Sequence, residues 1–298
     1  MENKRKTIPL IVVSIFLILV IGVFFALWNP QPPPVVQMPV PNGYTAFVQA
    51  ANLLQKQTGD YAKMDAASLL FLVEANSNAL QTARSGLAEK SRVPLEFSQT
   101  YMSRHLLELQ QMKMLAYAFL AEGRLAELDQ RTNDAVRSYV DAARLGVHSR
   151  RGGPLIDALV GIAEEVMGTW QLQKLAPNVD AKTAAELARQ LESLDAERES
   201  WDQIVQNEKY WTRGMYPGLQ YRIAALVGSV ESRAATAKSR QRFDAQQNKT
   251  RRLMLDLATH AYQLDKGHRP TNAADLVPAY LKAAPMDPLT GKEMTLTP

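Results

Sequence analysis

The sequence predicts an all-α protein with an N-terminal transmembrane helix, a Pro-rich linker, and a multi-helix bundle that includes a long helical hairpin. A small irregular C-terminal segment with at most a short strand follows. Three observations predict this class. An uncharged apolar stretch of about 21 residues lies near the N-terminus and is long enough to cross a bilayer as a helix. Ala, Leu, Gln, Glu and Arg, which favour helices, are frequent after it. Apolar residues recur at helical spacing from residue 44 onward.

The composition narrows the possible functions. The chain of 298 residues has 34 Lys and Arg against 30 Asp and Glu. The resulting net charge of +4 is too small for the strongly cationic surface of a nucleic-acid-binding protein, so we expect no nucleic-acid partner. The absence of Cys excludes a disulfide framework, a thiolate metal site and a Cys nucleophile.

Residues 1–28 are expected to form a basic cytoplasmic tip and a membrane anchor. The apolar run is Ile8–Trp28; basic residues at 4–6 precede it, and the next basic residue is Lys56. This asymmetry predicts a single-pass protein of a bacterial cytoplasmic membrane, with a cytoplasmic N-terminus and the bulk of the chain in the periplasm. The run lacks a small-residue cleavage site, which favours an uncleaved signal anchor over a cleaved signal peptide.

Residues 29–43 are expected to be a linker. Their prolines lack the N–H group that a helix needs and favour polyproline II. At about 3.1 Å per residue, such a segment is a semi-rigid spacer of roughly 40 Å.

Residues 44–175 are expected to form a helical body. Helices are predicted over Tyr44–Gln57, from the N-cap Asp65 onward, and over Gln99–Leu128. One continuous helix after Asp65 would carry five apolar residues: Leu69, Leu70, Val73, Leu80 and Leu87.

Within this body, Gly123 precedes Ala135, Tyr139 and Ala142 at a distinctive spacing. These positions resemble the packing positions of a tetratricopeptide repeat, and the similar stretch is 117–146. The resemblance implies two antiparallel helices that approach closely through small residues. No second copy follows at the family's period of about 34 residues, and a solenoid needs at least about three. We therefore expect a single degenerate unit inside a bundle.

A Gly-Gly-Pro break precedes the next predicted helix, Leu155–Leu175. Because it is apolar on most sides, we expect it to be the most buried helix, with glycines that allow close packing. Asp157, Glu164 and Glu165 exclude a second membrane crossing. Adjacent helix positions point about 100° apart, so we interpret the two glutamates as a solvated or ion-paired face and not as an acid–base pair.

Residues 176–266 are expected to form a long antiparallel helical hairpin. Asp180 should cap a first arm that runs to about Arg213. Apolar residues at steps of three and four, or multiples of them, define the helix–helix seam: Leu187, Leu191, Leu194, Trp201 and Val205 on the first arm, and Ile223, Leu226, Val230, Ala234 and Ala237 on the second. The second arm carries a basic run: Arg233, Lys238, Arg240, Arg242, Lys249, Arg251 and Arg252. We interpret this run as a solvated face.

The remaining segment, residues 267–298, has the most specific pattern. Gly267 should end the preceding helix, and Asn272 with Asp275 should start a short one. The motif positions are Tyr262, Gly267, Pro270, Leu276, Tyr280, Leu281, Pro285, Asp287, Pro288 and Gly291. Over about the last 45 residues, this pattern resembles the C-terminal half of the type II secretion major pseudopilin. That family's calcium-binding loop and its N-terminal prepilin signature are missing.

The whole layout also resembles a class of uncharacterised bacterial envelope proteins. The shared features are the anchor and spacer, the opening at residues 42–44, the Leu155–Ala163 segment and the tail. This resemblance implies a location and no known activity.

The sequence contains no recognisable catalytic, cofactor-binding or metal site. The four histidines, His105, His148, His260 and His268, lack metal-ligand spacing, and nucleophile, phosphate-loop and zinc motifs are absent. We therefore expect no cofactor and infer no small-molecule substrate.

We expect a non-enzymatic, membrane-anchored scaffold or interaction protein of the cell envelope, with another envelope protein as its partner. A secretion-type or pilus-like machine is suggested by the tail. Two alternatives stay open. One is an envelope enzyme that uses dispersed carboxylates, such as Glu164, Glu165 and Glu208. The other is a module that binds anionic lipid or cell-wall polymer through the basic run at 233–252.

Overall fold

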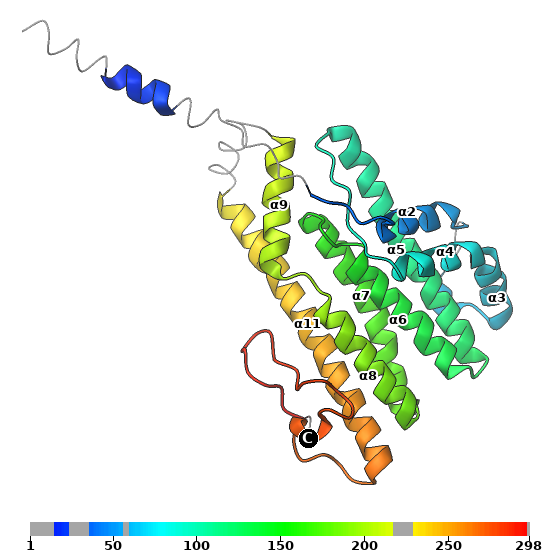
Figure 1. Cartoon of the computed structure of the whole chain (residues 1–298). Helices are drawn as coiled ribbons and strands as arrows, with labels where there is room; N and C mark the ends of the chain where they lie inside the picture. The colour runs from blue at the N-terminus through cyan, green and yellow to red at the C-terminus, as the bar shows by residue number, and fades with distance from the viewer. Residues whose placement is uncertain (1–14, 24–35, 56–59, 217–228, 297–298) are drawn as a thin grey trace, which may run out of the picture.

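The computed structural model describes residues 15–23, 36–55, 60–216 and 229–296. In these ranges the chain is helical and has no β-strand, which confirms the all-α class. The labelled elements are α2 Gly43–Leu53, η1 Tyr61–Lys63, α3 Ala66–Ala75, α4 Ser77–Leu87, α5 Gln99–Leu128, α6 Thr132–His148, α7 Leu155–Leu175, η2 Ala176–Asn178, α8 Ala181–Ala196, α9 Trp201–Met215, α11 Ser229–Lys266 and η3 Ala273–Leu276. Helices α2–α4 lie on one side of the bundle, α5–α7 in the middle, and α8 and α11 on the other (Figure 1).

The predicted membrane span, Ile8–Trp28, lies mostly outside the described residues. The part of it that is described, residues 15–23, is helical. Over the described ranges, no helix combines the length and apolarity that a membrane crossing requires. The anchor therefore stays a prediction.

The prediction of one continuous helix after Asp65 was wrong. Asp65 caps α3, as expected, by accepting a 2.8 Å hydrogen bond from the Ser68 amide, but the chain breaks at Asn76 before α4 begins. The Asn76 side chain donates to the Leu72 carbonyl and accepts from the Gln55 amide, both at 2.8 Å. The break is therefore held by the segment just after α2, through a contact between residues far apart in sequence.

Helix α5 has the predicted bounds, and it packs against α6 through the predicted small residue. A Cβ atom on Gly123 would lie 2.3 Å from the Tyr139 ring. The ring therefore needs a glycine opposite it. The tetratricopeptide resemblance itself is not tested by this contact.

Helix α7 also has its predicted bounds, and its glycines permit close packing as expected. A Cβ atom on Gly161 would lie 2.3 Å from the Gly146 carbonyl oxygen of α6, and one on Gly168 would lie 2.5 Å from the Tyr139 carbonyl oxygen. The two backbones are thus in contact. Because the two helices lie so close together, any side chain of α7 that faces α6 is buried in the interior.

The prediction that α7 is the most buried helix was wrong, because α6 buries more of its residues. Ile156, Val166 and Trp170 are exposed, whereas the carboxylates of Asp157, Glu164 and Glu165 are buried. Of the expected solvated or ion-paired face, Glu165 is ion-paired, and neither glutamate is solvated. The physical reason is a set of buried cations and polar groups inside the bundle, described below.

The predicted first arm of the hairpin, Asp180 to Arg213, is two helices. Asp180 caps α8 as expected, but the chain leaves the helix at 197–200, and Ser200 caps α9 by accepting from the Gln203 amide. The Glu199 carboxylate accepts from the Gly152 amide at 3.0 Å. This contact ties the break to the loop before α7.

Helices α8 and α11 pack antiparallel, as the hairpin prediction required. Asp195, near the end of α8, contacts Arg251, and the Val179 carbonyl just before α8 contacts His260 farther along α11. The apolar seam of α8 is buried: Leu187, Leu191 and Leu194. The apolar seam predicted for the second arm is not buried where the structure describes it, because Ala234 and Ala237 of α11 are exposed. Ile223 and Leu226 lie outside the described residues.

The C-terminal segment folds back on α8 and α11 (Figure 1). Gly267 has a φ of +74°, as expected of a helix stop, and Asn272 with Asp275 forms a capping box. At most a short strand is expected here from the sequence, and the segment has one isolated antiparallel bridge, between Met286 and Glu293. The Glu192 carboxylate of α8 accepts from the Lys282 amide at 2.9 Å, so the segment is fastened to the bundle.

Candidate functional site

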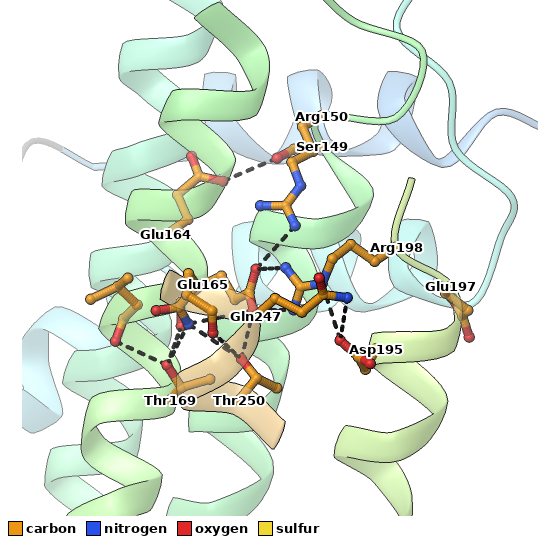
Figure 2. Close-up of polar contacts among 12 residues, drawn as sticks. Ser149, Arg150, Glu164, Glu165, Thr169, Asp195, Glu197, Arg198, Gln247 and Thr250 are labelled. Atoms are coloured by element: carbon orange, nitrogen blue, oxygen red, sulfur yellow. Dashed lines mark hydrogen bonds and ion pairs between the residues drawn. The ribbon is translucent and has the colours of Figure 1, made fainter. Parts of the chain in front are cut away.

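The buried charges of α7 are the most unusual feature of the bundle. Glu164 and Glu165 point into the interior, where the residues just after α6, the 197–200 segment and α11 bring polar side chains toward them (Figure 2). We call this set the α7 network, and its members are Ser149, Arg150, Glu164, Glu165, Thr169, Asp195, Arg198, Gln246, Thr250 and Arg251.

Glu165 is the centre of the network. Arg198 donates to both of its carboxylate oxygens, each at 2.6 Å, and Arg150 donates to one of them at 3.0 Å. The Thr250 hydroxyl of α11 donates to the other oxygen at 2.9 Å. All three charged side chains are at most 3% exposed. One carboxylate therefore joins three parts of the chain inside the protein.

The electrostatics of Glu165 follow from this geometry. Burial alone would raise the pKa of its carboxyl group, because a low-dielectric interior disfavours charge. The positive charges of Arg198 and Arg150 outweigh burial and lower the pKa to about 2. Glu165 is therefore ionised at neutral pH and is compensated by two buried cations.

Glu164 is the neighbour of Glu165 in the sequence, but its side chain lies in a different environment. Its carboxyl group accepts from the Ser149 hydroxyl at 3.0 Å, and its other oxygen, Oε1, has no partner among the described residues. Burial raises the pKa of Glu164 to about 8, so the group is largely protonated at neutral pH. The two adjacent glutamates thus differ in charge.

The network reaches the surface through Asp195. This carboxylate accepts from Arg251 at 2.7 Å and from Arg198 at 3.3 Å. Both arginines and Asp195 line an open cleft of about 710 Å³ between α8, α9, α11 and the C-terminal segment. Four other carboxylates line it: Glu192, Glu199, Asp202 and Asp244. Glu192 and Glu199 accept backbone amides and Asp244 contacts Arg240, so structural contacts occupy most of them.

A second buried polar chain links α2, α5 and α7. The His105 ring lies 2.9 Å from a carboxylate oxygen of Asp157 through Nε2, and the Tyr44 hydroxyl lies 3.2 Å from its Nδ1. All three side chains are at most 1% exposed. Burial lowers the pKa of His105, whereas Asp157 and Glu108 raise it, with a net rise. None of these three side chains lines the 710 Å³ cleft.

The structure separates the three carboxylates of the enzyme hypothesis. Glu164 contacts Ser149, Glu165 contacts the arginines, and the Glu208 carboxylate accepts from the Leu155 amide at 2.8 Å. Glu208 thus caps the start of α7. In the described part of the chain there is no group of three or more possible metal ligands from His, Cys, Asp and Glu.

The basic run of α11 is divided between two environments. Arg251 and Arg252 donate to the carbonyl oxygens of Met286 and Thr295 in the C-terminal segment. Lys238, Arg242 and Lys249 are exposed, and the side chain of Arg233 lies outside the described part. Part of the run therefore fastens the tail and does not form a free cationic surface.

Sequence reasoning missed Arg150, Arg198 and His105 as partners of the α7 carboxylates. The available signal was the presence of three carboxylates in an otherwise apolar helix, since buried charges in proteins are paired. The partners lie 15, 33 and 52 residues from the carboxylates that they contact.

Comparisons of the chain with protein-family models, with curated proteins and with solved structures find no match. The pseudopilin and tetratricopeptide resemblances therefore stay predictions.

Proposed function

We propose that this chain is a non-enzymatic scaffold of the bacterial cell envelope, tethered to the cytoplasmic membrane through residues 8–28. The observation that carries the proposal is that α7 has its carboxylates inside the protein and apolar side chains on its outer face, the reverse of the usual arrangement. Its carboxylates are held in contacts within the protein, whereas its outward face is apolar. Such a helix is rigidly fixed and presents a surface for another protein.

The tether rests on the sequence. A run of about 21 uncharged residues, preceded by three basic residues, favours a helix that crosses the membrane with its N-terminus in the cytoplasm. The Pro-rich spacer then holds the body away from the bilayer.

The outward row on α7 is the proposed contact surface. Ile156, Val166 and Trp170 are 36%, 37% and 57% exposed, and with the half-buried Val160 they follow helical spacing along one face. The Lys174 ammonium group lies 3.3 Å from the Trp170 ring centre. Contiguous exposed apolar side chains with polar edges are typical of protein interaction sites. The proposed partner is an envelope protein with a complementary apolar face, and the tail resemblance suggests a secretion-type or pilus-like machine.

A photo-cross-linking experiment tests the proposal. A photoreactive amino acid is placed at Val166 or Trp170 in the full chain in its native membrane, with Lys182 on α8 as the exposed control position. We expect both α7 positions to give the same adduct of one discrete mass and Lys182 to give none. Equal adducts from Lys182, or none from α7, would contradict the proposal.

The enzyme alternative has one supporting observation, the 710 Å³ cleft with its carboxylates. The contacts already made by Glu192, Asp195 and Glu199 leave few of these groups for substrate. The scaffold is the better supported function.

A further inference from the structure

A second pocket lies at the point where the linker joins the body. The final linker residues Val36 and Met38, the 92–95 loop, Gly152 and α9 enclose about 500 Å³. Pockets for small molecules typically measure about 300–1,000 Å³. The pocket does not include the α7 row, so what it binds is independent of the scaffold function.

One positive charge in this pocket lacks a partner. The Arg92 side chain lines the pocket and is half-buried, and no carboxylate in the described part of the chain forms an ion pair with it. The backbone of Arg92 is fixed, because its amide and carbonyl both bond to the Asn42 side chain at 2.9 and 2.8 Å. The guanidinium group is therefore anchored at its base and forms no ion pair within the described part of the chain.

A buried amide in the same pocket also lacks a partner. Asn207 of α9 is 6% exposed, and its Oδ1 accepts from the Gln203 side chain at 3.0 Å. Its Nδ2 has no acceptor among the described residues. A buried donor without an acceptor destabilises the fold. This nitrogen has almost no accessible surface, so the Asn207 side chain forms a fixed polar wall of the pocket.

The rest of the lining determines the kind of ligand. The apolar residues are Val36, Met38, Val93, Pro94 and Leu95. No described lining residue is acidic, and Arg92 is the one cation among them. A single guanidinium group matches a singly charged carboxylate, to which it can donate two parallel hydrogen bonds. A phosphate dianion would leave charge uncompensated.

We propose that this pocket binds a small carboxylate with an apolar body. The carboxylate pairs with Arg92, and the apolar part lies against the linker end and the 92–95 loop. Because the linker supplies one wall, the bound ligand contacts both the linker and the body.

The test measures ligand binding to the full chain in lipid nanodiscs by titration calorimetry. The probe is N-acetyl-leucine, and N-acetyl-leucinamide is its uncharged counterpart. We expect the acid to bind in the millimolar range or tighter and the amide at least about ten-fold more weakly, as a charge-assisted pair predicts. Arg92→Gln and Asn207→Asp should each weaken binding of the acid by at least about ten-fold. Arg242→Gln, an exposed arginine outside the pocket, should leave it unchanged.

Three outcomes would overturn the proposal: equal binding of acid and amide, undiminished binding by Arg92→Gln, or no binding of the acid at about 20 mM. Thermal unfolding of each variant shows that it is folded. If Arg92→Gln is unfolded, Asn207→Asp alone decides between the outcomes.

Discussion

At the scale of single residues, Glu164 and Glu165 show that of two identical neighbours on one helix, one can be ionised and the other neutral. Arg198 and Arg150 keep Glu165 ionised, whereas burial with one hydroxyl partner keeps Glu164 largely protonated. The difference arises entirely from which partners the fold supplies. The sequence shows only two adjacent glutamates.

The first prediction compares these neighbours. Glu165→Gln leaves Arg150 and Arg198 buried without a counter-charge, and removing one member of a buried ion pair costs about 3–5 kcal/mol. Glu164→Gln, the matched control, replaces a protonated acid by a neutral amide and should cost far less at pH 5. Denaturant unfolding followed by circular dichroism gives both free energies of unfolding. Equal losses in the two variants would contradict the assignment.

The pH dependence of the same variants separates the two environments. The pKa of Glu164 is raised on folding, so its ionisation progressively destabilises the wild type as pH rises from about 4.5 to about 8. Glu164→Gln should therefore gain stability relative to the wild type across that window. The pKa of Glu165 is lowered, so its contribution is present above about 4.5 and is lost as pH falls toward about 2.

At the scale of helices, local signals predicted some boundaries and long-range contacts set the others. Asp65 caps α3, Asp180 caps α8 and a proline precedes α7, all as the sequence predicted. The breaks at Asn76 and at 197–200 were missed. Asn76 bonds to the Gln55 amide, and Glu197 accepts from Arg151 at 2.7 Å. Neither contact leaves a local pattern in the sequence.

The direction in which α7 faces was missed for a related reason. Its apolar residues alone predict inward packing, because burial of apolar surface is the main driving force of folding. The cations that compensate its carboxylates lie on other segments, as Arg150 and Arg198 do. The rule that buried charges need partners identifies the problem, but the sequence does not show where the partners are.

The contact of α6 with α7 gives a prediction at this scale. In Gly161→Ala, the new Cβ atom would lie 2.3 Å from the Gly146 carbonyl oxygen, and backbone cannot move aside cheaply. We expect the free energy of unfolding to fall by about 1–3 kcal/mol, despite alanine's better helix propensity. Ala163→Ser, at an exposed position of the same helix, should change it by less than about 0.5 kcal/mol. A stabilised Gly161→Ala would show that the helices are not in contact there.

At the scale of the whole molecule, the bundle and its tail share one apolar core. Phe47 of α2, Phe119 of α5, Leu187 of α8 and Leu276 of the tail belong to the same buried cluster. Polar contacts from α8 and α11 fasten the tail. The described part of the chain after the linker therefore has the construction of a rigid body suited to presenting surfaces at a distance from a tether.

Cysteine labelling tests most directly the central claim that this body is held outside the cytoplasm by an N-terminal anchor. The chain has no Cys, so one introduced residue is its only thiol. Lys182→Cys places the thiol on α8 at a side chain that is 86% exposed, and Asn3→Cys places it before the predicted anchor. In spheroplasts treated with a membrane-impermeant maleimide, we predict that Lys182→Cys is labelled, that Asn3→Cys is labelled only after lysis, and that both stay with the membrane after an alkaline wash. Protection of Lys182→Cys until lysis, or release of the chain by the wash, would contradict the account.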